Sequence, residues 1–340
     1  MVNEELFKDK RVLITGGSGS WGNELTKQLL EKDPKEIIIY SRGELAQVNM
    51  ERKFRNPKLK FVIGDVRDYE TLRRTLKNVD YVYHLAALKH VPVCENQPQE
   101  AIKTNIDGTT NLINAAIENG IEKVIDVSTD KAVNPCNLYG MTKAVGEKLI
   151  IQANNLNSNT KFVCVRGGNV LGSNGSVVPF FIDQIKKFNK VTITDSRMTR
   201  YFLTLSEAIH LLFKASEFSH GGETFVMNMP SFYIQDLAEV LIDYYGNDTT
   251  EIEEIGIREG EKLHEMLVSE HESPNTYKFD EDYYSILPTI KIDTQEAIEN
   301  YYKFKNIKKV NFKEFTSQDN LKGKDVLKEF LALGGFLTHR

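Results

Sequence analysis

Short apolar segments alternate with longer segments of helical period through the first half of the chain. Six apolar segments are rich in β-branched residues, at 11–15, 36–40, 60–66, 81–87, 123–129 and 161–167. Strands buried on both faces lack the alternation of polar residues, so these segments predict a parallel sheet covered by helices on both sides. Helices are expected between them near 20–32, 44–56, 68–77, 99–119 and 137–157. The pattern predicts an α/β fold with a doubly wound parallel sheet.

The regular alternation ends near residue 168. Shorter strands are expected at 191–195, 223–228 and 251–257, and helices at 206–217, 234–246, 261–269 and 323–333. The tail from about Glu272 is charged and is expected to wrap irregularly before the last helix. The change in pattern predicts a dinucleotide-binding domain at 1–168 and a smaller α+β substrate domain at 169–340, with parts of the chain crossing between them.

Composition narrows the class of protein. With 41% hydrophobic residues, the 340-residue chain is able to bury a full core. Lys and Arg number 43 against 48 Asp and Glu, and no basic run tracks a phosphate backbone, so no nucleic-acid partner is expected. Three scattered cysteines, Cys94, Cys136 and Cys164, suit neither disulfides nor a metal, which favours a reducing compartment. The sequence shows neither a signal-peptide pattern nor the run of about 18 consecutive apolar residues that a membrane-spanning helix needs. A soluble cytoplasmic protein is therefore expected.

A glycine-rich segment, TGGSGSWG, follows the first predicted strand directly. Its glycines are spaced three apart, and the next helix begins within the motif. Glycines let the backbone turn tightly and approach a pyrophosphate, whose charge then faces the N–H groups of the helix start. The motif predicts a dinucleotide site built by Thr15, Gly16, Ser18, Gly19, Ser20, Trp21 and Gly22.

The end of the second strand decides which dinucleotide is expected. NAD-binding folds usually place an acid there, whereas this chain has Ser41 and Arg42. Arg42 suits a 2′-phosphate and favours NADP over NAD; in the alternative, Arg42 is solvated and Glu44 binds the ribose. Asp65, at the end of the third strand, is placed to bind the adenine amine, although such an acid also caps helices. Further residues expected in the cofactor site are Val66, Ala86, Ala87, Lys89 and Asn105.

The segment VSTDKAVNPCNLYGMTK, at 127–143, places two charged residues, Asp130 and Lys131, where an apolar strand should end. Tyr139 and Lys143 follow and share one face of a helix, about 5–6 Å apart. The ammonium is expected to lower the phenol pKa from about 10, so that Tyr139 takes a hydroxyl proton while hydride leaves the carbon. Tyr-x-x-x-Lys alone is common by chance, but after a glycine loop it predicts a redox base.

Together, these motifs resemble a known family. TGGSGSWG, GDVRD, HLAALKHVP, STDKAVNPCNLYGMTK and ITDSRMTRYFLTL are similar to the extended short-chain dehydrogenase/reductases, which have a Rossmann domain, and within them to the inverting UDP-N-acetylglucosamine 4,6-dehydratases. The resemblance runs from Lys8 to about Ser273. Its most specific element is Asp130-Lys131, because a retaining dehydratase is expected to show Thr-Asp-Glu and a 4-epimerase has no such pair. The family implies homo-oligomers, often hexamers, that act in surface-glycan synthesis.

The resemblance implies a role for each residue of the charged segment. Hydride removal from C4 makes a ketone, and elimination then needs a base at C5 and a proton for the departing C6 hydroxyl. It implies Asp130 as the acid, Lys131 as the base and Thr129 as hydrogen-bond donor to the 4-oxygen. Lys131 must be neutral to act, so burial and the Lys143 charge are expected to depress its pKa. In the alternative, Asp130 and Lys131 form a salt bridge that merely closes the strand.

The second half of the chain is expected to bind a UDP-sugar. Arg200 and Arg258 suit the diphosphate, since a guanidinium holds phosphate oxygens in pairs. The resemblance implies that Asn169 contacts a diphosphate oxygen and Val178 packs on the uracil. Lys89 and Glu261 complete the expected substrate site.

One position departs from the family pattern, and two other functions compete. Gly168 stands where these dehydratases tend to carry an aromatic residue, which is expected to leave room above the sheet. A UDP-hexose 4-epimerase of the same fold would depend little on Lys131. A non-catalytic NADP-binding redox sensor would bind the dinucleotide without turnover, although it has no need of the Tyr139–Lys143 base.

Overall fold

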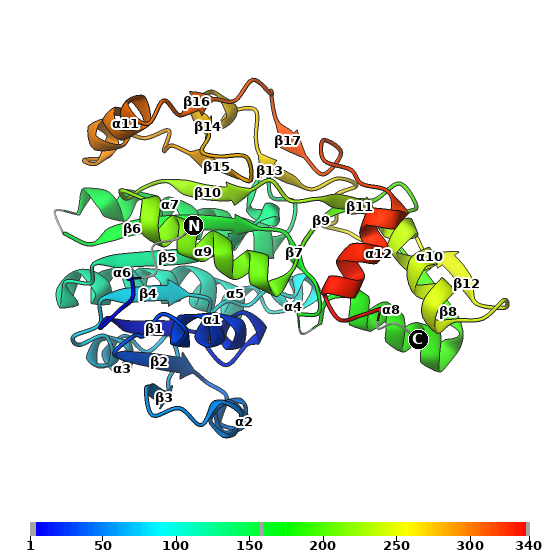
Figure 1. The fold of residues 1–340 in the computed structure, drawn as a ribbon, viewed down its shortest axis with the longest axis horizontal. Helices are drawn as coiled ribbons and strands as arrows, with labels where there is room; N and C mark the ends of the chain where they lie inside the picture. Colours follow the sequence, from blue (N-terminus) through cyan, green and yellow to red (C-terminus); the bar gives the residue numbers. More distant parts are fainter. Residues whose placement is uncertain (1–4, 157–158, 174, 338–340) are drawn as a thin grey trace.

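The computed structural model describes residues 5–156, 159–173 and 175–337, and a ten-stranded sheet lies at its centre (Figure 1). The strand order is β16-β14-β15-β10-β6-β5-β4-β1-β2-β3. The six predicted strands form most of its parallel part: β1 (Arg11–Thr15), β2 (Glu36–Ser41), β3 (Leu59–Ile63), β4 (Tyr81–His84), β5 (Lys123–Thr129) and β6 (Lys161–Gly167). The order reverses between β1 and β4, the switch point at which such sheets bind ligands. The predicted doubly wound fold is confirmed.

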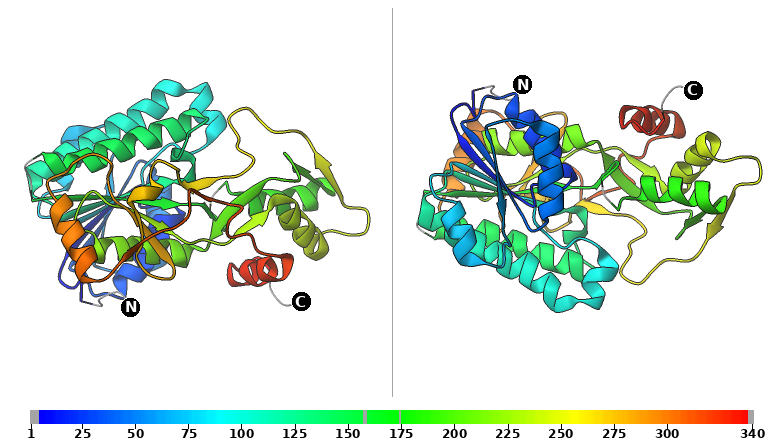
Figure 2. Two further views of the ribbon diagram at one scale, coloured as in Figure 1. Left: turned by 90° about the horizontal axis from the view of Figure 1, so that it is seen from above. Right: turned by 90° about the horizontal axis from the view of Figure 1, so that it is seen from below.

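Helices cover both faces of the sheet, with α6 and α7 on one side and α1 and α9 on the other (Figures 1 and 2). The helices of the first half are α1 (Ser20–Leu30), α2 (Glu44–Phe54), α3 (Tyr69–Thr75), α4 (Val91–Asn96), α5 (Pro98–Ile102), α6 (Gly108–Asn119) and α7 (Leu138–Gln152). The single helix expected at 99–119 is instead α5 and α6 joined by a π-helical turn, Lys103–Asp107.

Strands from the second half extend the same sheet. β10 (Thr224–Met227) pairs in parallel with β6, and β15 (Tyr283–Ile286) pairs antiparallel with β10. β14 (Thr276–Lys278) and β16 (Lys308–Lys309) follow at the edge, beside α11 (Gln295–Phe304). The tail is thus ordered structure rather than irregular wrapping. The chain after residue 168 therefore contributes strands to the sheet of the first domain, and the sequence predicted that parts of the chain cross between the two domains.

The remaining elements of the second half form a smaller lobe beside the sheet (Figure 1). They are β7 (Asn169–Val170), α8 (Val177–Phe188), β8 (Lys190–Ile193), β9 (Thr199–Leu203), β11 (Ser231–Tyr233), α10 (Ile234–Tyr245), β12 (Glu251–Glu254) and α12 (Lys324–Leu333). Phe181, Phe202 and Phe232 belong to its own hydrophobic core. Helix α9 (Leu205–Phe218), although it follows β9, packs against α1 on the large sheet.

The helix expected at 261–269 is absent from the structure, and that prediction is wrong. The segment runs into β13 (Met266–Val268), which pairs with β17 (Phe315–Thr316). Its backbone bonds outward instead of along a helix: Thr199 N donates to Leu263 O at 3.1 Å, and Ser317 N donates to Glu265 O at 2.8 Å. Within the described residues, no helix has the length and apolar character needed to cross a membrane.

Candidate active site

A cleft of about 1350 Å³ is lined both by the carboxyl ends of the parallel strands and by the smaller lobe. Most of the predicted site residues line it: Gly16, Ser18, Gly19, Ser20, Trp21, Gly22, Ser41, Arg42, Asp65, Val66, Ala86, Ala87, Lys89, Thr129, Lys131, Tyr139, Asn169, Arg200, Arg258 and Glu261. Six predicted residues are not in its lining: Thr15, Glu44, Asn105, Asp130, Lys143 and Val178. The structure therefore gathers residues from both halves of the sequence into one site.

The glycine loop forms a cradle that fits a pyrophosphate. Gly16 has φ +64°, and a Cβ there would lie 2.9 Å from Ala86 N. A Cβ on Gly22 would lie 2.1 Å from Gly17 O, so α1 packs directly on the loop. Gly19, the N-cap of α1, offers no side chain to the first N–H groups, and the first turn holds no acid. An anion is the natural partner for such a helix start.

Two predicted cofactor residues, Thr15 and Asn105, support the cleft wall from behind. Thr15 Oγ1 accepts hydrogen bonds from Leu85 N (3.1 Å) and Ala86 N (3.2 Å). Asn105 binds Leu88 through both its amide atoms, accepting from Leu88 N at 2.8 Å and donating to Leu88 O at 2.9 Å. Both side chains are buried and fix the 85–88 backbone, and their contact with a cofactor stays a prediction.

The end of β2 presents an arginine to the cleft. Arg42 is 55% exposed and lies 3.9 Å from Asp65 Oδ2. Asp65 is held by Arg67 at 2.6 Å, whereas the cap of the next helix is Asp68. Glu44, the alternative ribose ligand, is exposed on the first residue of α2 and does not line the cleft. Of the two residues, only Arg42 lines the cleft.

The charged segment forms a turn that closes β5. Residues Asp130–Ala132 make a short 3₁₀ turn, in which Thr129 Oγ1 donates to Asp130 Oδ1 at 2.9 Å. Lys131 Nζ also reaches Asp130 Oδ1, at 2.9 Å. Asp130 is fully buried, but Lys131 lines the cleft. The salt bridge between Asp130 and Lys131, which the sequence offered as an alternative to catalysis, is therefore present. The Lys131 amine also lines the cleft.

The expected depression of the Lys131 pKa is wrong for this structure. Burial lowers the pKa of Lys131, but the carboxylates of Asp130 and Glu265 outweigh burial, and the pKa lies above its ordinary value. Lys143, whose charge is expected to depress this pKa, is not among the main influences on it. The cation that lowers the pKa of Lys131 is Arg200. Two carboxylates near one ammonium favour its charged form.

Helix α7 packs closely on this turn. Its N-cap, Asn137, accepts a hydrogen bond from Gly140 N at 2.8 Å, and a Cβ on Gly140 would lie 2.2 Å from Lys131 O. Burial raises the pKa of Tyr139, and the cations Lys143 and Lys131 lower it without reversing the shift. The ammonium of Lys143 thus lowers the pKa of Tyr139 as predicted, but burial outweighs it and the pKa lies above its ordinary value. The two cations still favour the phenolate relative to burial alone.

The predicted diphosphate ligands differ in how free their donors are. Arg258 is 54% exposed and lies 3.9 Å from Glu261, and both line the cleft. Arg200 is buried and donates to backbone carbonyls of Thr199 (2.8 Å), Leu263 (3.2 Å) and Lys262 (2.9 Å). Arg258 thus has the more exposed guanidinium, whereas Arg200 mainly holds the 262–263 backbone.

Val178 and Gly168 do not have their predicted surroundings. Val178 is fully buried on the inner face of α8, in the core of the smaller lobe, because positions 178, 181 and 185 share that face. Its neighbours Val177, Pro179 and Phe180 line the cleft instead. A Cβ on Gly168 would lie 2.7 Å from Tyr201 Cβ, so the space expected above the sheet is filled by β9.

Two buried carboxylates near the site escaped sequence reasoning. Asp126 lies within β5, where a charge inside an otherwise apolar buried strand is a signal that was available. Glu265 lies in the segment that was predicted to be a helix, so its neighbours in the fold could not be predicted from the sequence. Asn169 begins β7 and lines the cleft as expected.

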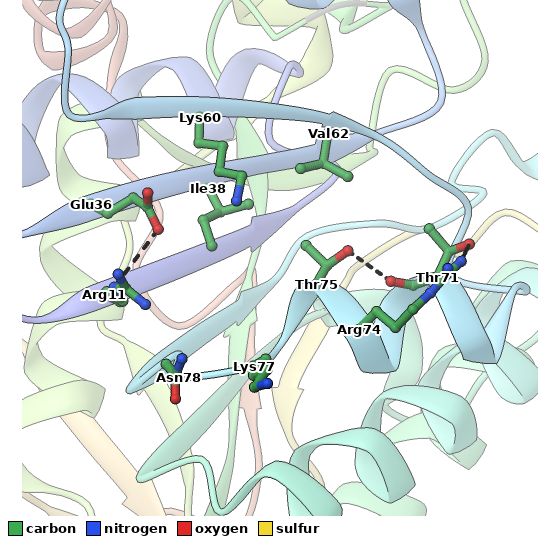
Figure 3. A pocket seen from close by; sticks show the side chains of 10 residues that line it. All are labelled: Arg11, Glu36, Ile38, Lys60, Val62, Thr71, Arg74, Thr75, Lys77 and Asn78. Atoms are coloured by element: carbon green, nitrogen blue, oxygen red, sulfur yellow. Dashed lines mark hydrogen bonds and ion pairs between the residues drawn. The ribbon is translucent and has the colours of Figure 1, made fainter.

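A second cavity, of about 510 Å³, lies between strands β1–β3 and helix α3 (Figure 3). Its lining includes Arg11 and Glu36, which begin β1 and β2 and lie 3.8 Å apart, and Lys60 and Arg74. None of the residues that line it lines the cleft, so this cavity is separate from the site.

Known proteins resemble this chain over most of its length. Residues 12–287 match the model of a family described as polysaccharide biosynthesis protein. The chain belongs to this family. It is 48% identical over 296 residues to the UDP-N-acetylglucosamine 4,6-dehydratase (inverting) of Campylobacter jejuni strain 81-176, covering 86% of this chain and 87% of that one. The relationship that the sequence motifs indicated is confirmed.

Two further relatives matter for function and fold. A UDP-glucose 4-epimerase of Rickettsia bellii is 47% identical over 273 residues, covering 78% of this chain and 80% of the relative. The X-ray structure of Pen from Bacillus thuringiensis has a TM-score of 0.90 at 38% identity, covering 97% of this chain and 99% of that one. The named sequence relatives are thus a dehydratase and an epimerase, both of UDP-sugars.

Proposed function

We propose that the protein is a UDP-N-acetylglucosamine 4,6-dehydratase that inverts C5. Its product would be UDP-2-acetamido-2,6-dideoxy-β-L-arabino-hex-4-ulose, for surface-glycan biosynthesis. The observation that carries the proposal is the Asp130–Lys131 pair, 2.9 Å apart at the end of β5, beside Tyr139. An elimination needs both an acid and a base, and this pair supplies them in one turn. The 48% identity to the Campylobacter dehydratase supports the same function.

NADP is the proposed cofactor, with NAD as the alternative. The start of α1 and the glycine loop would hold the pyrophosphate, and Arg42 would pair with the 2′-phosphate. A bound nicotinamide takes hydride from C4 and later returns it to C6. Arg258 and Asn169 are the proposed ligands of the UDP diphosphate. Assembly into homo-oligomers and a cytoplasmic location stay predictions.

Tyr139 and Thr129 act at the sugar C4 in this proposal. Tyr139 accepts the hydroxyl proton as hydride leaves, and the Thr129 hydroxyl hydrogen-bonds the ketone oxygen that results. Lys143 and Lys131 are the cations that lower the pKa of Tyr139 against its burial, and so favour the phenolate.

Asp130 and Lys131 act at C5 and C6. In the structure Lys131 carries the proton that the two residues share, because its pKa is raised. If this proton moves across the 2.9 Å contact to Asp130, Lys131 becomes a neutral base and Asp130 a protonated acid. A sugar that displaces water from the cleft favours this neutral form. Lys131 then takes the C5 proton, and Asp130 protonates the hydroxyl that departs as water. C5 takes a proton back on its opposite face, which balances the proton lost from O4.

The direct test is incubation with UDP-N-acetylglucosamine and NADP in deuterated water. We expect loss of one water by mass spectrometry, and deuterium at C5 with inverted configuration by NMR. A sugar that keeps its 6-hydroxyl contradicts the proposal. Failure to turn over any nucleotide sugar, with tight cofactor binding, would favour the redox-sensor function.

A second proposed function is a UDP-hexose 4-epimerase, which the 47% identity to the Rickettsia bellii epimerase favours. It predicts a C4 epimer without water loss. Lys131→Ala separates the two functions, because epimerisation has no step at C5. For the dehydratase we expect this variant to release water about 10²- to 10⁴-fold more slowly, which is the range for removing a general base. Hydride should still leave C4. For the epimerase we expect little change.

A further inference from the structure

Glu265 is a buried carboxylate that lies between two cations of the site. Its Oε1 atom is 3.6 Å from Lys131 Nζ and 3.6 Å from Arg200 Nε. The side chain is 3% exposed, and Oε2 has no hydrogen-bond partner among the described residues. Burying a carboxylate in such a place is costly unless nearby cations compensate for the lost water. Lys131 and Arg200 are the cations in contact with it.

The backbone of Glu265 is anchored to the smaller lobe. Glu265 N donates to Ser317 Oγ at 3.0 Å, and Ser317 N donates back to Glu265 O at 2.8 Å. Ser317 Oγ in turn lies 2.6 Å from Thr199 Oγ1, on β9. Lys131, by contrast, follows β5 of the large sheet. The carboxylate therefore reaches from one lobe to an amine carried by the other.

Further bonds hold the 260–265 segment to the loop that follows Lys131. Arg200 binds the carbonyls of Lys262 and Leu263. Lys262 Nζ donates to Val133 O, and Asn137 Nδ2 donates to Gly260 O at 2.7 Å. The segment is fixed on both sides, so the position of the Glu265 carboxylate is determined by the protein itself.

The four charges, of which Lys131 alone lies partly exposed in the cleft, compensate one another. Asp130 and Glu265 carry negative charge, and Lys131 and Arg200 carry positive charge. Without Glu265, the Lys131 ammonium would keep only its neighbour Asp130 and would be repelled by Arg200. Its long side chain would then leave the position that the two carboxylates give it.

We propose that Glu265 is a positioning residue for the elimination step, aiming Lys131 at the sugar C5 while Arg200 anchors the carboxylate. This inference rests on the proposed dehydratase function. It assigns to Glu265 no contact with the sugar. Its effect is confined to the step that Lys131 performs and does not extend to hydride removal, which Tyr139 performs.

The test is Glu265→Gln, which removes the charge and keeps the shape. In a single turnover, absorbance of the reduced nicotinamide reports hydride removal from C4, and mass spectrometry reports water loss. We expect hydride removal near the wild-type rate and water loss about 100-fold slower, as a misplacement of about 1 Å brings. Reduced nicotinamide should therefore accumulate. Glu265→Asp keeps the charge on a shorter stem and should recover part of the rate.

Glu270→Gln is the matched control. It makes the same change nearby, where Glu270 pairs with Lys313 at the surface, and should behave as wild type. Equal slowing of both steps in Glu265→Gln would mean a merely structural role and overturn the inference, as would unchanged water loss. If the glutamine variant does not fold, Glu265→Asp decides alone: it must slow water loss more than hydride removal. Wild-type protein that releases no water overturns the proposed function itself, a different outcome.

Discussion

Lys143 Nζ lies 3.2 Å from Oδ2 of Asp126, and both side chains are buried beneath the cleft. Burial lowers the pKa of Lys143, but Asp126 and Tyr139 together outweigh burial and the pKa lies above its ordinary value. The lysine is therefore charged at neutral pH. Because the carboxylate cancels much of its field, the ammonium acts on Tyr139 less than an unpaired cation would. This pairing explains in part why the pKa of Tyr139 stays raised.

Asp126→Asn is expected to destabilise the fold strongly. The change leaves an ammonium buried without its counter-charge, which costs about 3–5 kcal/mol in comparable buried pairs. Urea unfolding should show a decrease of this size in the free energy of unfolding. The control is Glu5→Gln, which breaks the exposed pair of Glu5 and Lys8 and should cost less than about 1 kcal/mol. Similar losses in the two variants would contradict the importance of the buried pair.

Arg42→Ala is expected to weaken NADP binding and to leave NAD binding nearly unchanged. A charge-assisted bond to the 2′-phosphate contributes about 1.5–3 kcal/mol, so the Kd for NADP should rise about 10- to 100-fold. Calorimetric titration with each dinucleotide measures both values. Arg52→Ala, on the exposed side of α2 and outside the cleft lining, is the control. Equal weakening of NAD and NADP would mean that Arg42 does not read the phosphate.

Local patterns determined how well the sequence predicted the fold. The strands 11–15, 123–129 and 161–167 begin and end as expected, because they are buried on both faces and bounded by polar residues. The glycine loop was also recognisable, since its turn and the helix start lie within eight residues. The segment 261–269 failed, because its backbone partners Thr199 and Ser317 lie more than fifty residues away along the chain.

The same distinction applies to the site. Sequence identified Tyr139 by its spacing from Lys143, and Lys131 by its place at the end of an apolar strand, and both line the cleft. It did not predict the pKa of Lys131, because Glu265 approaches it only through the fold. A helical pattern of apolar residues does not say which neighbour reaches the cleft and which, like Val178, packs in the core.

Glu272→Gln is expected to change the acid sensitivity of the fold. Glu272 binds the buried Arg166 at 2.7 Å, opposite Glu147. Burial raises the pKa of Glu272, but Arg166 and Ser269 outweigh it and lower the pKa to about 2. A depressed carboxylate pKa stabilises the fold above the ordinary value of 4.5, and this stabilisation disappears as pH falls toward 2.

The measurement is the free energy of urea unfolding over a pH series. The free energy of unfolding of the wild type should exceed that of Glu272→Gln most above about pH 4.5. The difference should shrink as the solution is acidified below that value. Glu329→Gln, at an exposed position of α12, should differ little from wild type throughout. A difference between wild type and Glu272→Gln that is independent of pH would contradict ionisation of Glu272 as its source.

Gly168→Ala is expected to destabilise the protein, although the position lines the cleft. The new Cβ would lie 2.7 Å from Tyr201 Cβ and 3.2 Å from Tyr201 O, so β9 would have to move away from the end of β6. Overpacking of this kind costs about 1–3 kcal/mol. Thermal and urea unfolding should both show the loss. Gly323→Ala is the matched control, because its Cβ would meet nothing within 4 Å and its φ of −82° suits alanine. If Gly168→Ala is as stable as Gly323→Ala, β9 yields freely, and the sugar pocket has room for the larger residue that the family tends to carry.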